Sequence, residues 1–372
     1  MPIDLENRLN EVGKAFYSSR DLREDYSSSS SDEESQKKKN CKKSKDGGKI
    51  DEDFDEKAEK AVCADVRMLS GCKDEQTSAD VNDVRKLGWS ATNRGAGGAC
   101  TNALLKSLKE GPTTWIGLLR RMRENLKHKK FVQIPQLSTS RKLDLDSSFR
   151  LMFNDGGGKH RALLIGINYV GQKAELSGCH NDVAQIKELI MKEGFTDSPE
   201  TMKILCDDGE HDDPTAKNLV NAFSWLIEEA EEGDSLFMHY SGHGGTMPDE
   251  DGDEADGQDE TMVPLDYLNV GHIIDDDLYK MIVAPLPSGV NLTIIMDCCH
   301  SGSIIDLPYV LSMNNELVTC LDEGGATPSM EPNSNFSLRK LFSALKRLYH
   351  TSRQEGVTYH EIGQNIKKIF GF

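Results

Sequence analysis

The chain has 372 residues and a formal net charge of -18 at pH 7, with 62 Asp and Glu against 44 Lys and Arg. This length suits one large domain with tails or two domains, and the acidic balance argues against nucleic-acid binding, which needs a clustered positive surface. Nine cysteines, an odd number, do not form the dense framework of a small secreted domain. No run of about 20 apolar residues and no signal-peptide start are present, which predicts a cytoplasmic protein that does not bind membranes.

Residues 1–60 are predicted to contain little folded structure. Residues 1–17 have apolar side chains at helical spacing, which indicates a short amphipathic helix. From Tyr26 to about Asp55 the chain is too polar to offset the entropy lost on folding, so a disordered charged linker is predicted. The basic run at 37–45 is interpreted as part of this linker, with a nuclear localisation signal as the alternative.

A first folded portion is predicted for residues 61–150. The segment 66–71 has the composition of a short strand, two segments have apolar spacings of three and four typical of helices, and a second strand candidate follows. The helices are expected at 99–111 and 113–129, and the second strand at 131–138. The glycines of the segment 151–159 predict a flexible join.

The pattern changes at His160, where apolar runs of strand length begin to alternate with longer amphipathic segments. Strands are expected at 162–168, 202–205, 235–241 and 292–297, and helices at about 181–193 and 214–232. Strands that are apolar on both faces predict an α/β fold, a mostly parallel sheet with helices on both faces. The tail 313–372 is expected to start as a loop, from about 314 to 335, and to end in two amphipathic helices near 336–349 and 359–370.

Two motifs at predicted strand ends have the residues of a thiol hydrolase, HYSGHGG at 239–245 and DCCHSGS at 297–303. Catalytic groups in a parallel sheet lie at the carboxyl ends of the strands, where an imidazole can take the proton of a nearby thiol. The glycines let backbone amides approach, so the N–H groups of Gly244 and Cys299 are candidates to hold an oxyanion.

A structural zinc site is the alternative for the second motif, with Cys298, Cys299 and His300 as ligands. Adjacent cysteines point to opposite sides of a strand end and no C-x-x-C partner is present, so this alternative is disfavoured. His239 is expected to be a buried sheet residue, and His300 a local packing residue.

The two motifs resemble those of the metacaspases, relatives of the caspases. SGHG followed by D-x-C-H-S-G matches this family, and LLIGINY at 163–169 with ELSGCHNDV at 175–183 is similar to its first strand and first helix. The resemblance implies a caspase-like fold and a cysteine endopeptidase that acts through an acyl-enzyme. It also implies that Cys299 is the nucleophile and His243 its base.

The order of the two halves resembles that of type III metacaspases, in which the small portion comes first. Segments 69–81, 95–99 and 135–146 are similar to the small subunit of the family. The resemblance therefore implies a small, p10-like portion at 61–150 and a large, p20-like catalytic portion at 160–312. A compact fold tolerates such a circular permutation when a flexible join spans the old termini. Because the usual loop between the halves is absent, we hypothesise that activity does not depend on a cut between them.

The resemblance also implies a substrate-binding set, which we name the specificity group: Cys179, Asp182, Ser241 and Asp297. Two carboxylates in a semi-enclosed site favour a guanidinium, with bidentate geometry that prefers Arg over Lys. Cleavage after Arg, then Lys, is expected, and negligible cleavage after Asp. The alternative for Asp182 by itself is an acidic residue that stabilises a helix N-terminus.

Acidic side chains are concentrated between Asp249 and Glu260, where eight acidic residues and no basic residue occur. Oxygen ligands at this density suggest calcium, and an acidic surface loop is the alternative. The run is not an EF-hand, because Glu254 stands where the turn needs glycine. The resemblance implies another calcium site, the acidic group, which would act as a switch on the nucleophile segment: Asp259, Asp275, Asp276 and Asp306.

Two other functions stay open at this stage. One is a calcium-responsive scaffold that has lost proteolysis, and the other is a legumain-type or paracaspase-type protease. The segment 69–81 favours a metacaspase over either protease. The expected partners are proteins or peptides with Arg or Lys before the cleaved bond, and the resemblance suggests a monomer.

Overall fold

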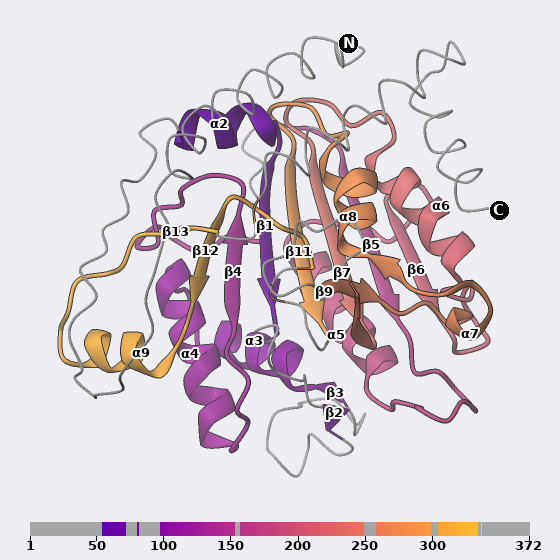
Figure 1. Ribbon diagram of the computed structural model, residues 1–372, viewed down its shortest axis with the longest axis horizontal. Coiled ribbons are helices and arrows are strands. Elements are labelled where there is room, and N and C mark those ends of the chain that lie inside the picture. The colour runs from indigo at the N-terminus through magenta and orange to yellow at the C-terminus, as the bar shows by residue number, and fades with distance from the viewer. Residues whose placement is uncertain are drawn as a thin grey trace, which may run out of the picture.

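A large mixed sheet forms the centre of the protein. The computed structural model describes residues 54–71, 80–81, 97–152, 157–248, 258–298, 302, 304–333 and 336. Within them, eight strands are ordered β13-β12-β4-β1-β11-β7-β5-β6 (Figure 1). Their bounds are β1 Asp65–Ser70, β4 Gln136–Thr139, β5 His160–Gly166, β6 Met202–Cys206, β7 Ser235–Ser241, β11 Asn291–Asp297, β12 Tyr309–Ser312 and β13 Glu331–Pro332. The neighbours from β1 to β6 pair in parallel, and β4, β12 and β13 join through antiparallel pairs, which confirms the mostly parallel sheet.

Both faces of the sheet are covered by helices, as predicted. Alternate residues of β7 belong to different core clusters: Leu236, Met238 and Tyr240 lie in one and Phe237 in the other. This follows from the two-residue period of a strand. The first cluster includes α6 (Ala216–Ile227), α8 (Asp275–Leu278) and a π-helical turn (Tyr279–Val283), and the second includes α3 (Ala99–Lys109), α4 (Trp115–His128) and α5 (Cys179–Lys192).

The portion that comes first in the chain adds its strands directly to those of the second portion. β1 pairs in parallel with β11 from Asp65 opposite Asn291 to Ser70 opposite Met296, and β4 lies on the other side of β1 (Figure 1). The two portions therefore share one sheet, which is the arrangement that the predicted permutation requires. The boundaries proposed between them stay predictions.

The predicted linker is wrong at its C-terminal end, because helix α2 spans Phe54–Ala61. Phe54 packs edge-on against Tyr309 with ring centroids 5.6 Å apart, and Ala58 and Ala61 are buried. These three apolar residues lie on one helix face with spacings of four and three. Most residues of this segment are charged, so the sequence pattern did not reveal the short apolar face of the helix.

The loop predicted from about 314 to 335 is also wrong in part. Helix α9 spans Asn315–Asp322, and the Asn314 side chain caps it by accepting a hydrogen bond from Leu317 N. β13 then pairs with β12, which itself pairs with β4. The strand predicted at 131–138 is shorter than expected, since β4 starts only at Gln136.

Smaller elements lie beside the main sheet. β8 (Gly244–Pro248), β9 (Gln258–Met262) and β10 (Ile273–Ile274) form a three-stranded sheet, β2 (Asp80–Val81) pairs with β3 (Gly97–Gly98), and α7 spans Tyr267–Val270. No helix of the described residues is both long and apolar enough to cross a membrane.

Several predictions concern residues outside the described ranges. They are the helix at 1–17, the linker before Phe54, the acidic residues 249–257, Cys299 with His300, and the two C-terminal helices except Phe336.

Candidate active site

The two motifs predicted to be catalytic lie at the ends of adjacent strands, as expected. In the register of the sheet, Ser241 at the end of β7 lies opposite both Gly166 of β5 and Asp297 of β11. His243 therefore follows β7 by two residues, and Cys298 follows β11 directly. The carboxyl ends of three parallel strands place these residues at one edge of the sheet.

The two carboxylates of the specificity group converge on Gly98, the residue before helix α3. Asp182 is fully buried, and its Oδ2 accepts hydrogen bonds from Ser241 Oγ at 2.9 Å and from Gly98 N at 2.8 Å. Asp297, 4% exposed, accepts a hydrogen bond from Thr101 N at 2.7 Å. A Cβ atom at Gly98 would overlap the Asp297 carboxylate and lie 2.9 Å from Asp182 Oδ2.

This contact explains why a glycine occurs at position 98, within the 95–99 segment. Only a residue without a Cβ lets the backbone approach both carboxylates. The N-terminus of α3 offers N–H groups that have no acceptor within the helix, together with the positive end of the helix dipole, and both stabilise two negative charges that lie close together. Sequence reasoning linked this segment to the small portion without finding its contact with Asp182 and Asp297.

Cys179 is the first residue of α5, the helix that also contains Asp182. Its backbone N–H donates to Asn168 Oδ1 at 3.0 Å, and its side chain is buried. Asp182 is in the first turn of the same helix, yet its carboxylate bonds to Ser241 and Gly98. The interpretation of Asp182 as only a helix-terminus residue is therefore incomplete. The structure brings Asp182, Ser241 and Asp297 together, and Cys179 begins the helix that contains Asp182.

His243 is held by contacts on both its ring and its backbone. Its Nε2 lies 2.7 Å from the carbonyl oxygen of Ala174, and its ring lies over Tyr169 with centroids 4.6 Å apart. A carbonyl only accepts hydrogen bonds, so Nε2 must be the protonated nitrogen. In the neutral imidazole, Nδ1 is then the basic nitrogen.

Two tyrosines fix the His243 backbone. Its N–H donates to Tyr169 Oη at 3.1 Å, and Tyr240 Oη donates to its carbonyl oxygen at 2.7 Å. Burial raises the pKa of both phenols, so they stay neutral and keep their donor hydrogens. Tyr169 Oη in turn donates to the carbonyl of Val263 at 2.7 Å.

The loop around Tyr169 is anchored by Asp207, which sequence reasoning missed. Tyr169 has a φ of 54°, and the Asp207 carboxylate accepts from the backbone N–H groups on both sides of it, Asn168 at 2.8 Å and Val170 at 2.9 Å. Burial acts to raise the pKa of Asp207, but hydrogen bonds from His180 and from these two amides lower it below its usual value. Asp207 thus positions the tyrosine that contacts His243.

The first cysteine of the doublet is a core residue. Cys298 is 1% exposed and belongs to the cluster that contains Tyr240. Gly244 begins β8 opposite Met262. Cys299, predicted as both nucleophile and oxyanion donor, lies outside the described residues.

His239 is a buried sheet residue, as predicted. It is 0% exposed, and its Nε2 lies 3.4 Å from Thr101 Oγ1. Burial lowers its pKa to about 3, which keeps the ring neutral at physiological pH. A neutral imidazole in this place supports the α3 N-terminus without adding positive charge near Asp297.

Three members of the acidic group lie around the three-stranded sheet. Asp259 is on β9, and Asp275 and Asp276 begin α8 directly after β10, which pairs with β9. Asp275 is 2% exposed, and Asp276 Oδ2 accepts from Lys280 Nζ at 2.6 Å. Glu260, next to Asp259 at the end of the acidic run, is also buried.

Asp306, the fourth member, lies after the nucleophile segment. It is 7% exposed and accepts a 3.4 Å hydrogen bond from Asn333 Nδ2. The acidic group does not form a compact ligand set: among the described residues, the only cluster of three or more possible ligand atoms within 4.8 Å is that of Cys206, Asp208 and His211.

Comparisons with known proteins identify the family. The family model described as "Metacaspase, peptidase C14 domain" matches residues 160–308, and the one described as "Caspase domain" matches residues 18–145. The first range contains both catalytic motifs.

Named metacaspases are similar over long stretches of the chain. "Metacaspase III c" of Phaeodactylum tricornutum is 45% identical over 78% of this chain and 85% of its own length. "Metacaspase-1" of Coccidioides immitis is 48% identical over 45% of this chain and 37% of its own length, and "Metacaspase-1B" of Aspergillus clavatus is 42% identical over 60% and 52%. The chain thus spans about half or less of these two fungal relatives. The match to the first relative, together with the caspase-like sheet and the strand-end motifs, shows that this chain belongs to the metacaspase family of cysteine endopeptidases.

Proposed function

We propose that the protein cleaves peptide bonds after Arg and Lys, with Cys299 as nucleophile and His243 as base, and that calcium activates it. The convergence of the Asp182 and Asp297 carboxylates at Gly98 is the observation that most supports this specificity. Membership of the family accounts for the cysteine peptidase activity. The two buried carboxylates account for the proposed preference for Arg or Lys before the cleaved bond.

A guanidinium complements this arrangement in both charge and shape. Its planar fork of donors forms bidentate hydrogen bonds with carboxylates, whereas a lysine ammonium acts as a point charge, so Arg is preferred over Lys. An aspartate side chain would add a third carboxylate beside Asp182 and Asp297, and in a buried site this repulsion is weakly screened. Cleavage after Asp is therefore disfavoured.

The proposed chemistry is acyl transfer. His243 takes the Cys299 proton through Nδ1, because Nε2 is committed to the Ala174 carbonyl. The thiolate adds to the carbonyl carbon of the basic residue, and the N–H groups of Gly244 and Cys299 hold the resulting oxyanion. His243 then gives its proton to the leaving amine, and water releases the acyl group from Cys299.

The first test is hydrolysis of a fluorogenic arginyl peptide by the purified full chain, with calcium and with a chelator. We expect turnover with calcium, about background with the chelator, and none in a Cys299→Ala variant. An aspartyl peptide with the same flanking residues is the matched substrate control. Comparable turnover of the two peptides would contradict the proposed specificity, and equal rates with chelator would contradict the calcium switch.

The acidic group suits calcium in its chemistry. Calcium binds six to eight oxygen ligands, and carboxylates are the usual protein donors. Asp275 and Asp306 are buried acids that a bound cation would neutralise. Because the four carboxylates do not lie within 4.8 Å as a set, binding requires their loops to approach, and Asp306 would draw the nucleophile segment with it.

Lys280 gives this switch a testable competitor. Its ammonium lies 2.6 Å from Asp276 Oδ2 and 3.6 Å from Asp277 Oδ1. Asp276→Ala is expected to weaken calcium binding by about tenfold or more, measured by calorimetry on the full chain. Lys280→Met is expected to strengthen binding, because it removes the cation that competes for Asp276.

The matched control is Asp277→Ala, which removes a neighbouring acid that is outside the acidic group. It should change calcium affinity less than Asp276→Ala. If Asp276→Ala left both the calcium affinity and the calcium dependence of hydrolysis unchanged, the assignment of Asp276 as a ligand would be wrong.

A further inference from the structure

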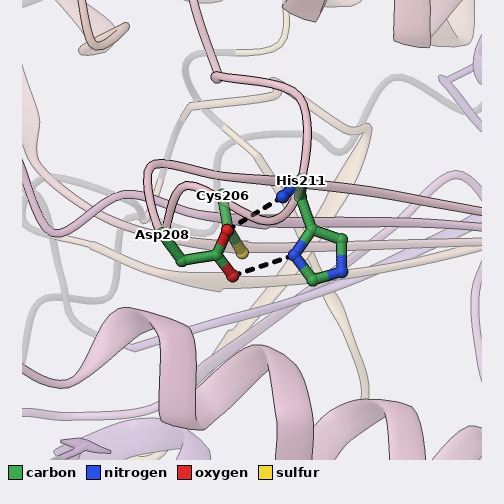
Figure 2. Close-up of side chains that lie close together, drawn as sticks. All are labelled: Cys206, Asp208 and His211. Carbon is green, nitrogen blue, oxygen red and sulfur yellow. Dashed lines mark hydrogen bonds and ion pairs between the residues drawn. The ribbon is translucent and has the colours of Figure 1, made fainter.

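A second candidate metal site lies in the loop that follows β6, the edge strand of the main sheet. The loop turns back on the strand end: Cys206 N donates to the Asp212 carbonyl at 3.2 Å, and Leu205 and Asp212 form a parallel bridge. Gly209 has a φ of 77°, a conformation that glycine adopts without strain. The return of the chain brings His211 close to Cys206 (Figure 2).

The loop is ordered by the Asp208 carboxylate. Its Oδ1 accepts from the backbone N–H groups of Glu210 and His211, both at 3.0 Å, and its Oδ2 lies 2.8 Å from His211 Nδ1. Figure 2 shows the three side chains of Cys206, Asp208 and His211 pointing toward one another. The possible ligand atoms, one sulfur, one oxygen and one nitrogen, all lie within 4.8 Å of one another.

We propose that Cys206, Asp208 and His211 bind a divalent metal ion of the zinc class, with water as the fourth ligand. One thiolate, one imidazole and one carboxylate are ligands that zinc accepts in tetrahedral geometry. Calcium and magnesium do not suit this set, because they bind oxygen ligands and have little affinity for sulfur. Zinc is therefore a different ion at a different place from the calcium proposed for the acidic group.

The exposure of the ligands provides an entry path and a protected interior. The His211 and Asp208 side chains are 37% and 23% exposed, whereas Cys206 is 2% exposed. An ion can reach the imidazole and carboxylate from solvent and then bind the thiol beneath them. Metal binding would replace the contact between Asp208 and His211 by a bond from the ion to each group.

Metal binding must displace the thiol proton, because the thiolate is the form of cysteine that binds a metal ion. Affinity for the metal is therefore expected to rise with pH.

The site is separate from the catalytic machinery. Asp207, between two of the proposed ligands, directs its carboxylate to Asn168, Val170 and His180, whereas Cys206 and Asp208 face the loop. Neighbouring residues of an extended chain point to opposite sides, which explains this division.

The experiment uses the full chain with Cys299→Ala as background, so that the catalytic cysteine cannot bind the metal. Zinc affinity is measured by calorimetry, and cobalt is added separately as a spectroscopic probe. We expect one equivalent of zinc and a thiolate-to-cobalt charge-transfer band. His211→Ala should weaken zinc binding by more than about tenfold, and Cys206→Ser should do the same and abolish the band.

Matched controls are Cys320→Ser and His128→Ala, which remove an exposed cysteine and an exposed histidine on other elements. Both should retain zinc affinity and the cobalt band. Because His211 is partly exposed, its variant is expected to fold even if Cys206→Ser proves unstable. Unchanged zinc affinity in His211→Ala, or a cobalt complex without a thiolate band, would overturn the proposal.

Discussion

Replacing Asp297 with asparagine is expected to lower kcat/KM for arginyl peptides by about 100- to 4000-fold. Breaking a buried ion pair by removing one charge costs about 3–5 kcal/mol, and each 1.4 kcal/mol is a factor of ten. The asparagine keeps the size of the side chain and an oxygen that can accept from Thr101 N. The loss would therefore report the missing charge toward the substrate guanidinium more than a missing support for α3.

The same reasoning applies to Asp182→Asn. Its Oδ1 can still accept from Gly98 N or Ser241 Oγ, so the contacts of the carboxylate are partly retained while its charge is removed. Citrulline, a neutral isostere of arginine, gives the decisive readout. The wild type should prefer arginyl over citrullyl peptides strongly, and each variant should lose most of this preference.

Asp234→Asn is the matched control, because Asp234 is a buried acid just before the opposite end of β7. It is 4% exposed and accepts from Lys159 N at 2.7 Å and Glu231 N at 2.9 Å. Its variant should unfold at a lower temperature but keep the preference for arginine over citrulline. If Asp182→Asn and Asp297→Asn also kept that preference, the two carboxylates would not be the determinants of specificity.

The central strands could be predicted because they are apolar on both faces. The strand expected at 235–241 is β7, Ser235–Ser241, and the one expected at 292–297 lies within β11, Asn291–Asp297. The small sheet of β8, β9 and β10 could not be predicted this way. Its strands are two to five residues long and partly exposed, and β9 begins with Gln and Asp, so no apolar pattern marks them.

Only those residues of the candidate site that have reactive side chains could be predicted from the sequence. Cys179, Asp182, Ser241 and Asp297 came from the family resemblance. The structure brings the last three together and places Cys179 in the same helix as Asp182. The contacts that position them use backbone groups far away in the chain: Thr101 N and Asp297 are 196 residues apart in sequence. Backbone N–H and C=O groups exist at almost every residue, so no sequence pattern identifies which of them will bind a carboxylate.

Asp207 shows that the positioning role of a side chain can also be impossible to predict from the sequence. It occurs among several acidic residues after β6, and nothing in that composition distinguishes it from its neighbour Asp208. The fold distinguishes them, because Asp207 faces the loop around Tyr169 and Asp208 faces His211. One residue supports the active site and the next belongs to the proposed zinc site.

Replacing His243 with alanine is expected to lower kcat for arginyl peptides by about 100- to 10,000-fold, the range over which a general base contributes. The geometry indicates which nitrogen is lost. Nε2 is held by the Ala174 carbonyl at 2.7 Å, so Nδ1 is the group that would take the thiol proton. The tyrosines bind the backbone of residue 243, whereas the ring makes the contact with Tyr169 and the hydrogen bond to Ala174.

Because these backbone contacts remain in His243→Ala, the variant should keep its fold and contain a gap beside Tyr169. Added imidazole is expected to restore part of the turnover in a concentration-dependent way, since it can replace the missing base. His239→Gln is the control on the same chain segment: it alters a fully buried histidine, so its effect should appear in thermal unfolding and should not respond to imidazole. His243 would not be the base if His243→Ala had the thermal stability of the wild type, a kcat within a few fold of the wild type, and no response to imidazole. A large loss of kcat that imidazole reverses would instead locate proton transfer at the ring that Ala174 and Tyr169 orient.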